Sequence, residues 1–579
     1  MASSTLADYI ITALQRAGVC RLFGMPGGGS NADLIEAAGR AGLPFTLAHT
    51  ETASAFMASA QAELTGKPGA IVATLGPGAA SVMNGVANAL LDRIPLLVLT
   101  DCYGEDAARV MQHQVLRHGE LFAPVTKGSF RLRAEVLQTS AAQCAGQGDL
   151  RQPPAGLEQT LERAIAEALG PPAGPVHLDC GLEVTGAESS REPDAGSPAI
   201  LQNVPPAGLM LTSAVERALR HSRRPIFLIG LGARTSKIAA ALRNLCERHG
   251  IPALVTYKAK GVIPDRHPWF GGVLTHGALE RPVLVRADLF IAVGLDPVEL
   301  LPRPWTYPQP VISLSAWQMS QQHIPLFADL VADVVDGLHA IGACLPGTTA
   351  WDCAWLQQAV QSQRAVMRAG TPSNKLLPHQ VVELAAEVYP DARVTVDAGA
   401  HMFPVLSLWP AQEPCGLLIS NGLATMGFAL PAAIGAALLD NSKPTLVFTG
   451  DGGLLMCMAE LRTAARERVP QRAEVLQTSA AQCAGLEGLR LRIIVFDDST
   501  LSLIGIKQAQ RGYRPDGVNF GEIDWPSLGA SLGVPTYQAT DPQSLERCVR
   551  DTLDHAGPVM SAARIDPEPY LGIMRALRG

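Results

Sequence analysis

A glycine-rich segment, Gly450-Asp451-Gly452-Gly453, follows the apolar run 445–449 and precedes a helical pattern over residues 454–466. Glycine lets the backbone approach a ligand closely, and a helix N-terminus offers free N–H groups with a partial positive charge. Asp451 adds a carboxylate, which is a hard oxygen ligand of the kind that Mg²⁺ prefers. The segment therefore suits a diphosphate held with a magnesium ion, although an Asp-Gly turn after a strand is often only a turn.

A second acidic turn, Asp497-Asp498-Ser499-Thr500, follows the apolar run 492–496. Ligands of parallel sheets bind beyond the carboxyl ends of the strands, so this turn is expected at the same crevice as Asp451. A solvent-exposed turn at a strand end is the alternative interpretation.

A third acidic residue, Glu51, lies far upstream in His49-Thr50-Glu51, directly before an apolar helical run over residues 53–64. Its carboxylate either favours the helix N-terminus electrostatically or is a buried group with a raised pKa that relays a proton. The residues alone leave both interpretations open.

The elements that must position these residues form a repeating pattern. Apolar runs followed by Gly- or Pro-rich turns and helical patterns recur along the whole chain, which indicates βαβ units with parallel sheets. The predicted fold class is α/β, with three doubly wound, Rossmann-like parallel-sheet domains over residues 1–185, 205–345 and 375–575, and a linker at 186–206. Strands are expected to end at Gly24, His49, Gly76, Asp101 and Asp179, and to span 225–230, 253–257, 289–294, 311–315, 394–397, 417–421, 445–450, 492–497 and 559–565.

Composition excludes several classes of protein. The chain has 579 residues, 47% hydrophobic, with a net charge of −7 and no basic run, which argues against disorder and against a nucleic-acid partner. Its scattered cysteines indicate a reduced, cytoplasmic protein rather than a disulfide framework or a structural zinc site. The apolar stretch 416–439 contains polar residues and a proline, so we expect no membrane helix, and residues 1–19 are expected to form an ordinary first helix.

Several motifs, in this order along the chain, resemble one known family. They are FGMPGGGSNADLIEA (23–37), HTETASAFMASAQAELTGKPG (49–69), YKAKGVIPDRHPW (257–269), NGLATMGFALPAAIGAAL (421–438), GDGG (450–453) and FDDSTLSLIGIKQ (496–508). The chain resembles, over nearly its whole length, the thiamine diphosphate-dependent enzymes of the acetolactate synthase and benzoylformate decarboxylase group. The resemblance implies a pyrimidine-binding domain, a central domain and a diphosphate-binding domain, and a homodimer or homotetramer with active sites at the subunit interface.

The resemblance also assigns site residues. Glu51 falls on the catalytic glutamate, which hydrogen-bonds the aminopyrimidine ring of thiamine diphosphate. The Mg²⁺ ligands fall on Asp451, on Asp498 in place of the usual Asn, and on the carbonyl of Thr500. The cofactor-binding positions are Glu51, Ala400, His401, Ala424, Met426, Gly450, Asp451, Gly452 and Gly453, where Met426 supports the bent cofactor. Gln114 and His401 are candidate substrate residues, although a His at a loop start is often only a cap or surface residue.

The implied activity is on 2-oxo acids, which are small molecules. Loss of CO₂ is followed either by protonation, as in a decarboxylase, or by addition to a second carbonyl, as in an acetolactate synthase-like carboligase. Two alternatives stay open: a C–C lyase or hydrolase of a diketone or 2-hydroxyacyl thioester with the same cofactor, and a catalytically silent paralogue that acts by assembly. Retention of Glu51 and Asp451 argues against the silent paralogue.

FAD is a further question, because acetolactate synthases bind it in the central domain. The segment Gly230-Leu231-Gly232-Ala233-Arg234 follows a strand and could approach a nucleotide diphosphate, but a single glycine pair is weak support. The strand-end sequence at 293–297 differs from that of the flavin-binding members. FAD is therefore the less favoured alternative, and it stays open.

The same segment, RAEVLQTSAAQCAG, occurs at 133–146 and at 472–485. Such identity between otherwise diverged blocks indicates recent copying rather than an ancient repeat. The second copy lengthens the chain between Asp451 and Asp498, but the entropy of loop closure grows only logarithmically with length, so the two ligands can still converge. We expect exposed loops or frayed helices at both copies.

Overall fold

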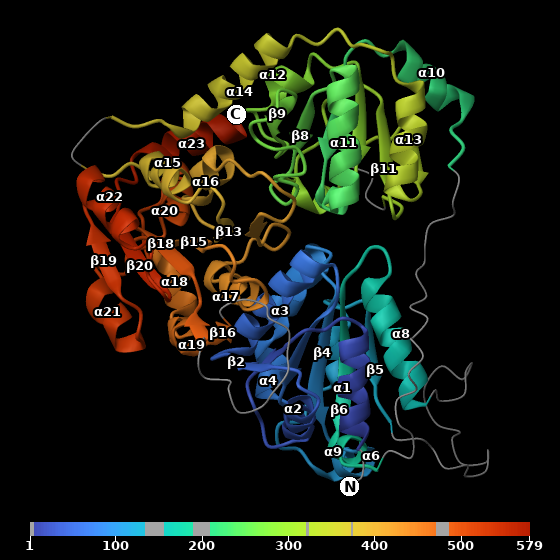
Figure 1. The fold of residues 1–579 in the computed structure, drawn as a ribbon, viewed down its shortest axis with the longest axis vertical. Helices are drawn as coiled ribbons and strands as arrows, with labels where there is room; N and C mark the ends of the chain where they lie inside the picture. Colours follow the sequence, from blue (N-terminus) through green and yellow to red (C-terminus); the bar gives the residue numbers. More distant parts are fainter. Residues whose placement is uncertain (1–4, 134–155, 189–208, 320–323, 372–374, 471–485) are drawn as a thin grey trace. The chain divides into compact units, whose positions relative to one another are not determined.

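The computed structural model describes residues 5–133, 156–188, 209–319, 324–371, 375–470 and 486–579 (Figure 1). The chain divides into two compact units, Met1–Asn203 and Val204–Gly579. This division falls within the segment 186–206 that the sequence predicts as a linker.

The first unit is built on one six-stranded parallel sheet in the order β2-β1-β3-β4-β6-β5. Its strands are β1 (Leu22–Gly24), β2 (Phe45–Leu47), β3 (Gly69–Ala73), β4 (Leu96–Cys102), β5 (Gly128–Arg131) and β6 (Pro175–Gly181). Its helices are α1 (Leu6–Arg16), α2 (Ser30–Arg40), α3 (Glu51–Thr65), α4 (Pro77–Ser81), α5 (Met83–Leu91), α6 (Glu105–Val110), α7 (His118–Phe122), α8 (Leu157–Leu169) and α9 (Leu182–Thr185).

Helix α1 confirms the prediction of an ordinary first helix. Thr5 and Asp8 form a capping box at its N-terminus, where Asp8 accepts from the Thr5 backbone N–H at 2.9 Å. Ile10, Ile11 and Leu14, spaced at helical period, are buried in the core that α1 shares with α2, α8 and one face of the sheet.

The second unit contains two further parallel sheets of six strands. The first has the order β12-β11-β10-β7-β8-β9, from β7 (Pro225–Ile229), β8 (Ala253–Val255), β9 (Phe270–Val273), β10 (Leu289–Val293), β11 (Val311–Ser315) and β12 (Ala328–Val331). Its flanking helices are α10 (Ser213–His221), α11 (Ser236–His249), α12 (Arg281–Leu284), α13 (Val334–Cys344) and α14 (Cys353–Met367), with 3₁₀ turns at Leu231–Ala233 and Pro297–Glu299.

The last sheet has the order β14-β13-β15-β18-β20-β19. Its strands are β13 (Arg393–Val396), β14 (Leu417–Ile419), β15 (Thr445–Gly450), β18 (Leu491–Asp497), β19 (Thr536–Ala539) and β20 (Val559–Arg564), and β16 (Arg468–Pro470) and β17 (Leu486–Gly488) form a separate antiparallel pair. Its helices are α15 (Pro378–Val388), α16 (Met402–Leu408), α17 (Ala429–Leu439), α18 (Asp451–Cys457), α19 (Glu460–Arg466), α20 (Ser502–Gln510), α21 (Trp525–Leu532), α22 (Pro542–Asp551) and α23 (Pro569–Arg578).

The predicted fold class is confirmed, since all three sheets are parallel and helix-flanked. Each sheet reverses its strand order at an inner position, between β1 and β3, between β7 and β10, and between β13 and β15, and the first and third sheets reverse again at their last pair. Such a reversal leaves a crevice at the carboxyl ends of the two strands, where α/β proteins bind ligands. The helical pattern over 454–466 corresponds to two helices, α18 and α19, the first of which already begins at Asp451.

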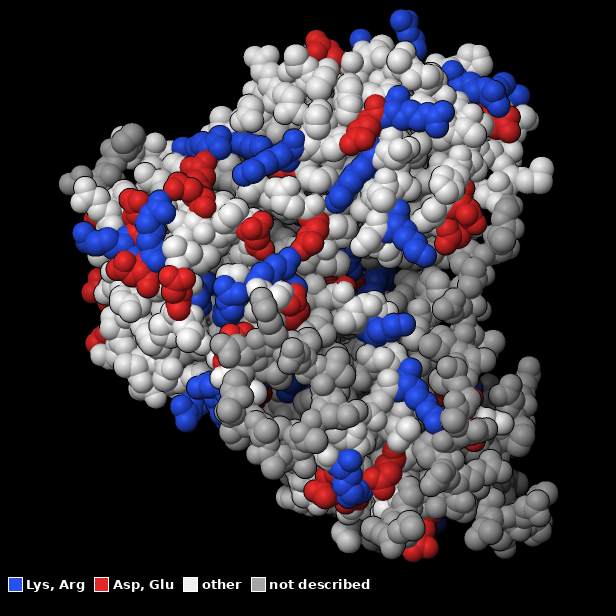
Figure 2. All heavy atoms as spheres, viewed as in Figure 1, with Lys and Arg blue, Asp and Glu red and all other residues white. Residues whose placement is uncertain are grey.

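The apolar stretch 416–439 contains strand β14, a loop and helix α17, whose residues from Ala429 to Leu438 are all buried. A helix that is apolar on every side is explained by burial in a core. Across the described ranges, no helix combines the length and the apolar character that crossing a membrane requires. Lys and Arg side chains are interspersed with Asp and Glu on the face shown in Figure 2. Both copies of the duplicated segment lie outside the described residues, except for Arg133.

Candidate functional site

A cavity of about 280 Å³ lies at the carboxyl ends of β13, β15 and β18, next to the reversal of strand order. Every candidate residue that the sequence places in the third block lines this cavity: Ala400, His401, Ala424, Met426, Gly450, Asp451, Gly452, Gly453, Asp498 and Thr500. They come from four separate loops, so only the fold brings them together.

Asp451 is the residue that joins two of these loops. Its Oδ1 accepts from the Gly452 N–H at 2.7 Å, and its Oδ2 accepts from the N–H groups of Asp498 at 3.0 Å and Ser499 at 2.7 Å. The β15–α18 turn is therefore hydrogen-bonded directly to the β18–α20 turn, although Asp451 and Asp498 are 47 positions apart.

The two carboxyl groups share an electrostatically unfavourable site. Burial, and after it the charge of Asp498, raise the pKa of Asp451 to about 7. Burial also raises the pKa of Asp498, whose Oδ1 accepts from the Thr500 N–H at 3.2 Å and whose Oδ2 accepts from the Ser502 hydroxyl. Two neighbouring carboxyl groups do not readily carry a negative charge at the same time. A hard divalent cation would stabilise both in their ionised form. The residues present therefore fit Mg²⁺.

His401 contributes a buried polar atom to the same cavity. Its ring stacks on Phe496 with the centroids 5.3 Å apart, and burial lowers its pKa to about 3, so the ring is neutral at pH 7. Its Nε2 is buried and has no hydrogen-bond partner among the described residues. An unpartnered buried nitrogen that borders a cavity fits a polar ligand such as a phosphate oxygen.

The glycines of the 450–453 turn are required by their neighbours. A Cβ on Gly453 would lie 2.5 Å from the Asp397 carboxylate, and one on Gly452 would lie 2.6 Å from Leu501 Cδ2 and 3.6 Å from Met426 Cε. Met426 therefore lies over the backbone that begins helix α18. Ala424, on the same loop as Met426, has a φ of 53°, a left-handed conformation that non-glycine residues adopt rarely and mostly at turns and functional sites.

Two residues of this site escaped the sequence analysis. Asp397 is fully buried, and its carboxylate accepts from the N–H groups of Phe428 at 2.7 Å and Ala429 at 3.0 Å and from the Thr449 hydroxyl at 2.8 Å. It thus fixes the start of α17 to β15. Lys507, on α20, lines the cavity, and burial lowers its pKa. The position of Asp397 at a strand end was the available signal, whereas Lys507 is part of a motif without a glycine or acidic marker.

Glu51 and Gln114 belong to the first unit. Glu51 begins α3 and is 8% exposed, and Thr50 caps the helix by accepting from the Ala53 N–H at 3.1 Å. Glu51 Oε1 lies 3.3 Å from where a Cβ on Gly78 would stand, and Gln114 Cβ lies 2.8 Å from the corresponding position on Gly76. The structure therefore places Glu51 and Gln114 against one turn, which follows β3.

In the central sheet, the glycine-containing turn after β7 is the segment that the sequence suggests for FAD binding. The N–H of Leu231, in the glycine-containing turn after β7, donates to Glu299 Oε2 at 2.9 Å, and Thr256 donates to Oε1 of the same carboxyl. A Cβ on Gly230 would stand 2.5 Å from Glu299 Oε2. The backbone of this turn is thus already hydrogen-bonded to the chain's own Glu299 carboxyl.

The sequence comparisons agree with this architecture. Residues 4–120 match the thiamine pyrophosphate enzyme N-terminal TPP binding domain, residues 212–340 match the central domain, and residues 397–487 match the C-terminal TPP binding domain. Glu51, Gln114 and Asp451 lie inside the matched ranges, whereas Asp498 and Thr500 lie beyond them. The chain therefore belongs to the thiamine pyrophosphate enzyme family.

Within this family the chain is acetolactate synthase-like. It is 26% identical to an acetolactate synthase of Bacillus subtilis, over 97% of this chain and 93% of that protein. It is 26% identical to the acetolactate synthase isozyme 1 large subunit of Escherichia coli, over 97% and 94%, and 25% identical to the catabolic acetolactate synthase of Raoultella terrigena, over 97% and 95%.

Proposed function

We propose that this protein is a thiamine diphosphate- and Mg²⁺-dependent enzyme that decarboxylates 2-oxo acids, joins their acyl fragment to a second carbonyl, or does both. The observation that carries the proposal is the cavity of about 280 Å³ around which four loops gather the candidate diphosphate and metal residues. When bound, thiamine diphosphate supplies an electron sink for breaking or forming a bond beside a carbonyl carbon.

Each residue has a proposed task that its surroundings support. Asp451, Asp498 and the Thr500 carbonyl would hold Mg²⁺, and His401 Nε2 and the N-terminus of α18 would hold phosphate oxygens. Met426 would pack against the cofactor and support its bent form. The ammonium group of Lys507 would balance the negative charge of the cofactor's diphosphate. Glu51 would exchange a proton with the pyrimidine ring, and Gln114 would contact the substrate.

A larger cavity of about 860 Å³ shares Met402, Ala424 and Leu503 with the diphosphate cavity. Its lining is largely apolar but includes Arg303, Arg578 and the carboxyl of Glu299. A guanidinium in an apolar wall suits the carboxylate of a small organic acid, which supports a 2-oxo acid as the substrate. FAD stays the less favoured alternative.

The predicted domain ranges 1–185, 205–345 and 375–575, a homodimer or homotetramer with active sites between subunits, and a cytoplasmic location are parts of the same proposal. Asp451 accepts hydrogen bonds from the backbone N–H groups of Asp498 and Ser499, so the β15–α18 and β18–α20 turns stay in contact despite the inserted segment. This contact favours an enzyme over a silent assembly paralogue.

The test is titration calorimetry of the metal-stripped protein with thiamine diphosphate, with and without Mg²⁺. We expect binding that needs Mg²⁺, that is lost in Asp451→Ala, and that is kept in Asp551→Asn, which alters an exposed carboxylate of the same unit. Absence of binding by the wild type would refute the proposal. Product analysis with 2-oxo acids, diketones and acyl thioesters then separates a decarboxylase or carboligase from a C–C lyase or hydrolase.

A further inference from the structure

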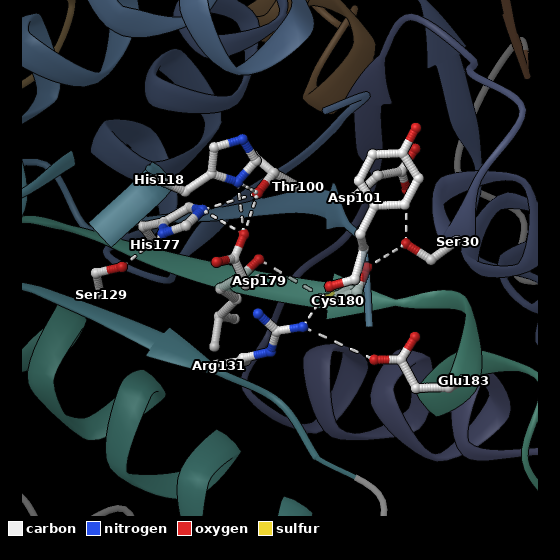
Figure 3. A network of polar contacts seen from close by, with 12 residues as sticks. Ser30, Thr100, Asp101, His118, Ser129, Arg131, His177, Asp179, Cys180 and Glu183 are labelled. Atoms are coloured by element: carbon white, nitrogen blue, oxygen red, sulfur yellow. Dashed lines mark hydrogen bonds and ion pairs between the residues drawn. The ribbon is translucent and has the colours of Figure 1, made fainter. Parts of the chain in front are cut away.

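A cluster of two histidines and one aspartate lies in the first unit, on strand β6 and at the start of helix α7 (Figure 3). His118 begins α7, while His177 and Asp179 are two positions apart on β6. The side chains point toward one another, with one ligand-type atom from each within 4.8 Å of the others. Asp179 Oδ1 lies 2.7 Å from His118 Nδ1 and 3.5 Å from His177 Nε2.

The hydroxyl of Thr100 lies among these three residues. Its Oγ1 is 2.8 Å from His177 Nε2, 3.0 Å from Asp179 Oδ1 and 3.4 Å from His118 Nδ1. A hydroxyl carries one proton and can donate it to only one of the three. Thr100 donates it to Asp179 Oδ1, so two imidazole nitrogens and one carboxylate oxygen, all atoms of the types that bind metal ions, converge beside one hydroxyl.

A supporting shell holds the His177 ring. Its Nδ1 lies 2.7 Å from Ser129 Oγ, and the ring stacks on Phe122 with the centroids 3.9 Å apart. Metal-binding histidines commonly use their second nitrogen in this way, because the bond fixes the tautomer and the orientation of the ring.

The cluster also has a path to it. His118 and Asp179 line a cavity of about 370 Å³ that is bordered as well by Gln114, Arg117 and Arg131. A small ion can enter there, and a ligand position on that side would face the cavity rather than the protein core.

We propose that His118 Nδ1, His177 Nε2 and Asp179 Oδ1 bind a divalent transition-metal ion of the Zn²⁺ class, with a fourth position open to this cavity. Two imidazoles and one carboxylate are a donor set for such ions and not for Mg²⁺, which prefers oxygen ligands alone. The site is therefore chemically distinct from the one around Asp451.

One of the ligand separations already matches a tetrahedral site. Metal–ligand bonds of about 2.0–2.1 Å place neighbouring ligand atoms about 3.3 Å apart. The observed separation of 3.5 Å between His177 Nε2 and Asp179 Oδ1 fits this value, and the 2.7 Å contact of His118 with Asp179 must open by about 0.6 Å. The ion takes the place of the proton between these two residues, and His118 then carries its ring proton on Nε2, which has no hydrogen-bond partner among the described residues.

The open fourth position would hold water or a carboxylate oxygen of a small acid, and Arg117 and Arg131 border the same cavity. Since Gln114 is a candidate substrate residue and lines this cavity too, an ion here lies beside a part of the chain that the proposed function uses. The metal site itself does not depend on that function.

Co²⁺ is a suitable probe, because a tetrahedral Co²⁺ site absorbs visible light. The full-length, metal-stripped protein is titrated with CoCl₂ in excess Mg²⁺, so that the Asp451 site does not take up the probe. We expect one Co²⁺ per chain with tetrahedral absorption bands, displaced by Zn²⁺. Absence of these bands and of Zn²⁺ binding in the wild type would overturn the proposal, whether or not thiamine diphosphate binds.

Four variants locate the ion. His118→Gln and Asp179→Asn should abolish the bands, while Ser129→Ala should weaken binding about 10–100-fold, as loss of a supporting hydrogen bond does. His113→Gln, which alters an exposed histidine of the same segment, should change nothing. Far-UV circular dichroism checks that each variant folds, and if one variant fails to fold the others still decide. Bands of unchanged intensity in folded His118→Gln or Asp179→Asn would refute the assignment.

Discussion

The substitution Asp498→Asn tests the electrostatics of the proposed Mg²⁺ site. With a pKa of about 7, Asp451 is about 90% protonated at pH 6 and about 10% at pH 8 in the protein without metal. Mg²⁺ binds the ionised carboxylate, so binding should release about 0.9 proton per ion from Asp451 at pH 6 and about 0.1 at pH 8.

In Asp498→Asn an amide oxygen stays available while one negative charge is lost. The pKa of Asp451 should then fall but stay above its ordinary value, because the charge of Asp498 is the second cause of the shift and burial is the first. Proton release at pH 6 should therefore be smaller than in the wild type, and its midpoint should move to lower pH.

The same shift has a consequence for stability. The folded protein without metal holds a proton on Asp451 that the unfolded chain loses near pH 4. The free energy of unfolding should thus fall as the pH rises from about 4 to about 7, by up to about 1.4 kcal/mol per pH unit. In Asp498→Asn this fall should end at a lower pH.

Proton release is measured by titration calorimetry with Mg²⁺ and thiamine diphosphate in two buffers of different ionisation enthalpy. The cofactor's own protons are common to all variants, so the difference between wild type and Asp498→Asn isolates the protein, and Asp551→Asn is the matched control. Equal release at pH 6 and pH 8 in the wild type, or an unchanged midpoint in Asp498→Asn, would refute the reasoning.

Three further outcomes are expected. Glu51→Gln should lower kcat about 10²–10⁴-fold in steady-state assays while leaving calorimetric binding of thiamine diphosphate intact. Glu36→Gln, which alters an exposed carboxylate, is the control and should be unaffected. A wild-type kcat in Glu51→Gln would contradict the proton-transfer role. Gly453→Ala should cost about 1–3 kcal/mol in chemical denaturation, because its Cβ would stand 2.5 Å from Asp397 Oδ2, and an unchanged midpoint would contradict this contact. Lys507→Met should weaken cofactor binding, and more so at low salt, whereas equal affinity at every salt concentration would exclude its electrostatic role.

The sequence predicted the fold well wherever strands are buried on both faces. Strands β4, β15 and β18 are continuous apolar runs, and their carboxyl ends lie within a residue or two of the predicted positions. The strands that it missed in the three sheets, β5, β9, β12 and β19, all lie at a sheet edge. Edge strands are half-covered, so their sequences carry polar residues and glycine in place of a clear apolar run.

The residues of the candidate sites also divide into those that the sequence revealed and those that it did not. Asp451 and its glycines were visible because they stand together after a strand, and Glu51 because it opens an apolar helix. The cluster of His118, His177 and Asp179 was not visible, because 61 positions separate His118 from Asp179 and no short ligand spacing joins all three. Only the fold, which places the start of α7 beside β6, brings His118 to the other two side chains.

The antiparallel pair β16–β17 forms a stem at which the chain can accept inserted sequence. Arg468 pairs with Gly488 and Pro470 with Leu486, so the residues that flank positions 471–485 lie on neighbouring strands, about 4.8 Å apart. Asn441 ties this stem to the preceding loop by donating to Glu487 Oε1 at 2.9 Å and to the Gly488 carbonyl at 3.2 Å. We therefore expect that changes of sequence or length between β16 and β17 leave the ligand-bearing turns at their spacing, because this stem precedes β18.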